Sequence, residues 1–158
     1  MANSNMYSAS ADEIWGLFAD YVEGSPDAGA LALSTEPLPP TACNALEKSL
    51  AAFGYGNDAL AYATLLPHGA DANGAGEALD PQAEFLLIEG LDPICLIACD
   101  ERAIASLETT YRTTCKRDAA QHVFGRPCVA FGDLPILLTT DQGKQRAWSL
   151  LKTLPRIT

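Results

Sequence analysis

The chain lacks both a long apolar run and a leader-like first segment. No apolar stretch approaches the roughly 20 residues that a helix needs to cross a bilayer, so we expect no membrane partner. The opening residues contain neither a basic segment nor an apolar one, so we expect no signal peptide and a cytoplasmic location. With 158 residues, 48% of them hydrophobic, the chain is predicted to form a single domain, residues 1–158, with a flexible tail at residues 1–8.

Basic residues are scarce in the first half of the chain. The formal net charge is −10, and residues 1–80 hold 11 acidic side chains against one basic side chain, Lys48. Residues 81–158 are balanced, with 9 of each sign. Contacts with phosphates supply most non-specific affinity for nucleic acids, so this composition argues against strong DNA binding. Four bases close in sequence form either a local basic patch or a solvated surface cluster: Arg112, Lys116, Arg117 and Arg126.

Sequence patterns that hold metals or cofactors are also missing. The five cysteines include no C-x-x-C pair, and the chain has only two histidines. We therefore expect reduced thiols, no metal and no cofactor. Cys95 and Cys99 share one face of an expected strand and are interpreted as small buried hydrophobes. Cys115, beside Lys116 and Arg117, is a secondary candidate for a reactive thiol with a lowered pKa.

Helical and extended patterns alternate along the chain. Their order, α-β-α-β-α-β-α-β-α, predicts an α/β fold, a three-layer αβα sandwich around a short, mainly four-stranded parallel sheet. The longest loop is expected at residues 67–80. Strands are expected at residues 28–34, 59–66, 94–99 and 128–131, and helices at residues 10–23, 41–53, 83–89, from 100 onward, and ending near 154.

The first expected helix begins at Ser10 as its cap and ends at Gly24. Trp15 and Phe18 in this helix are interpreted as core or docking residues, with a binding platform as the alternative. Docking through these residues would make the protein a structural or assembly protein, such as a homodimer.

Several segments resemble, in the same order, the core of the uracil-DNA glycosylase superfamily. The segment LALSTEPLP (31–39) is similar to the family's first strand and loop, and LEKSLAAFGYG (46–56) to the helix and turn that follow. LDPICLIACDERAIASL (91–107) resembles a later strand and helix. The segment 129–154 resembles the last strand, its motif and the terminal helix, with KQRAW at 144–148 as the closest match. The resemblance implies a four-stranded parallel sheet between helices.

The family's functional positions are not matched. Its chemistry needs a polar residue in the first loop, a stacking aromatic, an Asn that reads the base, and a His that stabilises the departing anion. By this resemblance Glu36 stands in the first loop, Thr64 where the Asn belongs, and Gly132 and Asp133 where the family has His and Pro. The segment that carries the stacking aromatic has no counterpart, and neither do the cysteines of the cluster-bearing branches. The resemblance therefore implies the fold without the activity.

The candidate site consists of Glu36, Thr64, His68 and Asp133, at the expected carboxyl ends of the strands. Our first hypothesis is a non-catalytic domain that binds a protein or small-molecule partner in this pocket. The second is an enzyme, a divergent DNA glycosylase or other hydrolase, in which Glu36, His68 and Asp133 act as an acid/base cluster. The enzyme hypothesis requires these three side chains to share one cavity; the alternative for His68 is an exposed loop position. The third hypothesis is the homodimer.

Overall fold

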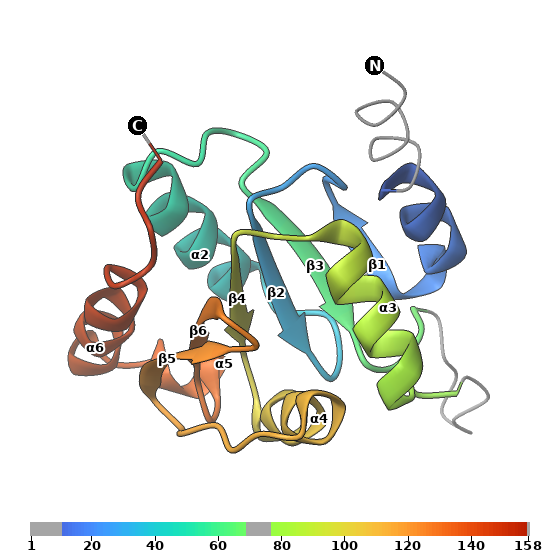
Figure 1. The fold of residues 1–158 in the computed structure, drawn as a ribbon. Coiled ribbons are helices and arrows are strands. Elements are labelled where there is room, and N and C mark those ends of the chain that lie inside the picture. Colours follow the sequence, from blue (N-terminus) through green and yellow to red (C-terminus); the bar gives the residue numbers. More distant parts are fainter. Residues whose placement is uncertain (1–10, 69–76, 158) are drawn as a thin grey trace.

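A six-stranded mixed β-sheet forms the centre of the protein (Figure 1). The structure, a computed structural model, describes residues 11–68 and 77–157. The strand order is β1-β3-β2-β4-β6-β5, in which the four central strands run parallel and the two edge strands run antiparallel to their neighbours. The strands are β1 (Val22–Gly24), β2 (Ala30–Ser34), β3 (Leu60–Thr64), β4 (Cys95–Ala98), β5 (Ala119–Val123) and β6 (Arg126–Ala130).

Helices connect these strands, and most begin at an acidic or hydroxyl cap. Residues 11–17 are helical and lead into the 3-10 helix η1 (Ala19–Tyr21). The remaining helices are α2 (Pro40–Ala52), α3 (Pro81–Leu91), α4 (Glu101–Tyr111), α5 (Leu134–Leu137) and α6 (Asp141–Leu151). None of the helices within the described residues is both long and apolar enough to cross a bilayer. Side chains that cap a first-turn amide are Asp80, Asp100, Asp133 and Thr140.

The sheet separates two apolar cores, because successive side chains of a strand point to opposite faces. In β2, Leu31 and Leu33 lie in the core covered by the first helix, α3 and α4, whereas Ala30 and Ala32 lie in the core covered by α2 and α6 (Figure 1). Helices thus cover both faces of the sheet. The predicted α/β fold with three layers is confirmed.

The edges of the sheet correct the expectation of a four-stranded parallel sheet. Val22–Gly24, expected to end the first helix, is a strand that pairs antiparallel with β3. Gly24 has a φ of 100°, and a Cβ there would lie 2.5 Å from the carbonyl oxygen of Leu60, so only glycine fits this close approach. Residues 22–24 can either extend the first helix or pair with the open edge of β3. Pairing with β3 replaces the last helical turn.

The second missed edge is a hairpin formed by β5 and β6. His122 lies in β5 opposite Pro127. The turn consists of Phe124 and Gly125, with φ values of 52° and 81°, as in the tight turns that match the twist of paired strands. Phenylalanine rarely adopts a positive φ, which is why the sequence did not indicate this hairpin. The short helix α5 lies between β6 and α6.

The first helix contributes to the core, as one of the two interpretations proposed. Phe18 is buried, and Trp15 and Ile14 pack against the same cluster. Gly90 on α3 allows this contact, since a Cβ there would lie 2.6 Å from Ile14. The expected cap Ser10 lies outside the described residues, as does most of the expected 67–80 loop.

Candidate functional site

The neighbouring parallel strands β2 and β4 end side by side, and the connections that follow them cross opposite faces of the sheet. The chain leaves β2 through α2 on one face and leaves β4 through α4 on the other. Open α/β sheets place their ligand sites at such points. A cavity of about 280 Å³ lies here, which we name the strand-end pocket. It is lined by Thr35, Glu36, Pro37, Leu38, Pro39, Cys99, Asp100, Asp133 and Pro135.

Asp100 is the most heavily hydrogen-bonded side chain of the strand-end pocket. Its carboxylate accepts hydrogen bonds from the amide of Thr35 at 2.7 Å, from the hydroxyl of Thr35 at 2.8 Å and from the amide of Ala103 at 2.8 Å. It therefore caps α4 and ties down the loop after β2 at the same time. A carboxylate used in this way has little capacity left for a ligand.

Asp133 also serves as a helix cap. Its Oδ1 accepts the amide of Ile136 at 3.1 Å, at the start of α5. Its backbone forms an antiparallel bridge with Asp100, and the next amide, that of Leu134, donates to the carbonyl of Cys99 at 3.0 Å. The loop after β6 is thus anchored beside the loop after β4.

The structure brings two of the four candidate site residues together. Glu36 and Asp133 both line the strand-end pocket, whereas Thr64 and His68 are not among its lining residues. Thr64 is buried at the end of β3, and its hydroxyl donates to the carbonyl of Leu66 at 2.6 Å. His68 lies beside the β1 edge: its amide donates to the carbonyl of Asp20 at 2.6 Å, and its Nδ1 lies 3.8 Å from the carboxylate of Glu23. The enzyme hypothesis requires Glu36, His68 and Asp133 to share one cavity, and this condition is not met, because His68 does not line the strand-end pocket.

Four of the five cysteines are buried, and Cys43 is partly exposed. Cys95 and Cys99 face the same core, as predicted from their spacing. Burial raises the pKa of the Cys115 thiol, and nearby Glu108 acts in the same direction; this is opposite to the activation considered from its basic neighbours. Burial likewise raises the pKa of Cys128 to about 12. Within residues 11–68 and 77–157, no three His, Cys, Asp or Glu side chains are grouped so that they could hold a metal ion.

Two members of the suggested basic patch are neutralised by acids. Arg126 has a side chain only 10% exposed and pairs with Glu89 at 2.7 Å and Asp92 at 2.8 Å. Although burial alone would raise the pKa of Glu89, the hydrogen bonds from Arg126 and Tyr111 lower it. Arg117 pairs with Glu101. These pairs leave less free positive charge than the sequence spacing suggests.

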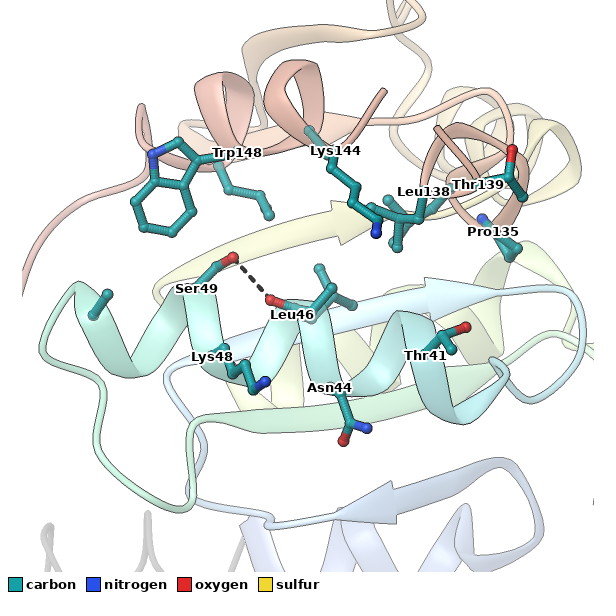
Figure 2. A pocket seen from close by; sticks show the side chains of 15 residues that line it. Thr41, Asn44, Leu46, Lys48, Ser49, Pro135, Leu138, Thr139, Lys144 and Trp148 are labelled. Carbon is teal, nitrogen blue, oxygen red and sulfur yellow. Dashed lines mark hydrogen bonds between the residues drawn. The ribbon is translucent and has the colours of Figure 1, made fainter. Parts of the chain in front are cut away.

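A larger groove lies between α2 on one side and α5 and α6 on the other (Figure 2). Its volume is about 680 Å³, and we name it the α2–α6 groove. Ala45, Ser49 and Ala52 place small side chains along the α2 wall, opposite Ala147 on α6, so the two helices leave space between them. The remaining lining residues are Thr41, Asn44, Leu46, Lys48, Leu134, Pro135, Leu138, Thr139, Lys144, Trp148 and Leu151.

The polar groups of the groove are mostly at its rim. Lys144 points from α6 towards α2, and Lys48 extends from α2 (Figure 2). Within the described part of the chain, neither lysine pairs with a carboxylate. Trp148, 41% exposed, packs on Phe53 with ring centroids 5.1 Å apart. Ser49 is occupied, since its hydroxyl donates to the carbonyl of Ala45 at 2.8 Å.

The sequence contained a signal for this groove that composition alone did not reveal. Lys48 is the only basic residue among residues 1–80, and it lines the groove. The KQRAW string supplies both Lys144 and Trp148. Compared with known proteins, the chain matches no protein-family model and no curated protein sequence.

Proposed function

We propose that the protein is a non-catalytic binding domain with a uracil-DNA glycosylase-like fold. The observation that carries the proposal is the use of both strand-end aspartates, Asp100 and Asp133, as helix caps. The four central strands are parallel and have helices on both faces, which is compatible with the fold that the resemblance implies, and two antiparallel edge strands are added to them.

The chemistry at the strand-end pocket supports a non-catalytic role. General acid–base catalysis needs a free group within reach of the substrate, and the carboxylates of Asp100 and Asp133 are held by backbone amides. Gly132 stands where the resemblance requires an anion-stabilising histidine. Loss of one such group typically lowers a rate by about 10²–10³. Glu36 and Asp133 are both exposed in this pocket, but among the described residues only Glu36 has a carboxylate that accepts no hydrogen bond.

The alternative, an enzyme with a remodelled pocket, depended on His68 joining Glu36 and Asp133. His68 lies instead against Glu23 beside β1. A glutamate without a second free titratable partner is a poor basis for hydrolysis, so the geometry favours binding over catalysis.

The α2–α6 groove is the surface that supports binding. Its volume of about 680 Å³ lies within the range of roughly 300–1,000 Å³ typical of small-molecule sites. Its floor is apolar, and its few polar side chains lie at the rim, which is the usual composition of such sites. The strand-end pocket, at about 280 Å³, is smaller than that range.

Two assays test this proposal. The first measures excision of uracil from single- and double-stranded oligonucleotides at low salt, with a binding titration on the same substrates; we expect neither excision nor tight binding. The second measures binding of the neutral apolar dye Nile red. We expect saturable binding that Ala45→Phe abolishes, because the larger ring would fill the groove, and that Ala51→Phe preserves, because Ala51 is exposed on the same helix without lining the groove. Excision that disappears in Glu36→Gln would overturn the proposal.

A further inference from the structure

The charge of the α2–α6 groove is opposite to that of the protein as a whole. The chain has a net charge of −10, yet the groove is lined by Lys48 and Lys144 and by no acidic side chain. Residues 141–158, which include the α6 wall, hold four basic residues and one acidic residue. In an acidic protein, most of the surface repels anions, whereas a local cationic site attracts them.

The two lysines have no internal anion to balance them. Among the described residues their ammonium groups form no ion pair, whereas Arg117 and Arg126 each pair with glutamate. Within the described residues, only Arg117 and Arg126 of the ten lysines and arginines form ion pairs. Lys48 and Lys144 differ from the other unpaired bases in lining an apolar groove, so their charge is available to a ligand bound there.

The apolar surface beside this charge calls for an apolar ligand segment. Leu46, Leu134 and Leu151 are buried at the floor, Leu138 is half-buried, and the exposed ring of Trp148 extends the apolar wall. Burial of a ligand's apolar surface in such a site contributes about 25 cal/mol for each Å² removed from water. An occupant that satisfies both features has an apolar chain and an anionic head.

We propose that the α2–α6 groove binds a small anionic amphiphile, with its chain along the apolar floor and its anionic head near Lys48 and Lys144. This inference rests on the proposed binding function and names the chemistry of the ligand. The volume of about 680 Å³ suits a single short chain. Charge complementarity, the apolar floor and the groove size favour this occupant over a neutral lipid or a cationic peptide.

The test compares three ligands that share a ten-carbon chain: decanoate, decanol and decyltrimethylammonium. Binding to the full chain is measured by calorimetry, below the concentration at which each ligand aggregates. We expect the affinity to fall in the order decanoate, decanol, decyltrimethylammonium. Lys48→Gln and Lys144→Gln should each weaken decanoate binding about two- to fivefold, as for exposed charge pairs, and the double variant should bind decanoate no better than decanol.

Lys116→Gln is the matched control, because Lys116 is exposed and does not line the groove; it should leave all three affinities unchanged. Equal binding of decanoate and decanol by the wild type would overturn the proposal that the ligand's head is anionic, but not the proposal that the groove binds a ligand. Failure of every ligand, Nile red included, would overturn the proposed function itself. Sedimentation that shows a dimer converted to a monomer by Ala45→Phe would assign the groove to a second copy of the chain and overturn the small ligand.

Discussion

The strand-end pocket and the α2–α6 groove differ in what their polar groups already do. In the strand-end pocket, the carboxylate of Asp100 accepts three hydrogen bonds from Thr35 and Ala103. In the groove, Lys48 and Lys144 have no ion-pair partner within the described residues. A polar group that holds the fold together has little left to offer a ligand, whereas an unpaired one does. The position of a pocket in the fold is therefore a weaker guide to function than the occupancy of its polar groups.

The largest expected effect comes from removing Asp100. Asp100→Ala leaves two amides and a hydroxyl at the strand-end pocket without their acceptor. We expect a loss of about 3 kcal/mol in the free energy of unfolding, from the lost cap together with hydrogen bonds to a charged group. Urea denaturation followed by circular dichroism measures it. Asp100→Asn, which can still cap α4, should lose about half as much; a neutral Asp100→Ala would show that the carboxylate is not structural.

A second prediction concerns Glu84, which is unlike the side chains of either site because it is fully buried and incompletely satisfied. It lies between α3 and α4, where it accepts hydrogen bonds from Ser106 and Thr110, and its Oε1 has no partner among the residues that the structure describes. Burial raises its pKa above the ordinary value, although the two hydroxyls oppose this shift. Because the folded pKa is the higher one, the stabilising contribution is present at low pH and is lost as the pH rises through the folded pKa.

We therefore expect the wild type to lose stability relative to Glu84→Gln as the pH rises from about 4 to 7. Denaturation of both proteins across this pH range measures the difference. Using the difference between the two proteins cancels the contributions of the other acids. A difference that does not change with pH would mean that folding does not raise the pKa of Glu84.

The third prediction reverses a charge in the groove. Lys144→Glu should weaken decanoate binding by about tenfold, more than Lys144→Gln, because repulsion is added to the lost attraction. Decanol binding should change less than twofold, since the apolar floor is untouched. Calorimetry at low salt measures both. The effect should shrink at higher ionic strength, and a loss that is equal for decanoate and decanol would point to a change in groove shape.

The sequence predicted the four central strands because each is a short apolar run between turn residues. It missed β1 and β5, which are short edge strands whose residues are only partly buried. Tyr21 and Val22 continued a helical spacing, so only the open edge of β3, a feature of the folded sheet, assigns Val22 to a strand. Hydrogen bonding to a distant strand decided these segments, and local propensity does not report it.

The same edge explains why the candidate site was only partly assembled. Glu36 and Asp133 follow the ends of parallel strands and meet, as expected from the fold class. His68 follows the end of β3, but its amide is bound by the carbonyl of Asp20, next to the unforeseen β1 edge. Lys48 and the KQRAW string were visible in the sequence, but the groove that they line was not, because it depends on small residues of α2 lying opposite α6, about 100 positions later in the chain.

The smallest expected effect comes from Glu36, whose carboxylate lies in the strand-end pocket without the structural contacts that Asp100 makes. Glu36 lies in the strand-end pocket beside Asp100, but its carboxylate is exposed and forms no hydrogen bond or ion pair within the described residues. Glu36→Gln should therefore change the free energy of unfolding by less than about 0.5 kcal/mol, as for other surface substitutions. The same denaturation assay as for Asp100 measures it. If polar groups at this pocket contribute to stability only through their hydrogen bonds, removing the Asp100 carboxylate should lower the free energy of unfolding severalfold more than removing the Glu36 carboxylate. A loss from Glu36→Gln as large as that from Asp100→Ala would mean that Glu36 supports a structural contact, and the pocket would then contain no free acid at all.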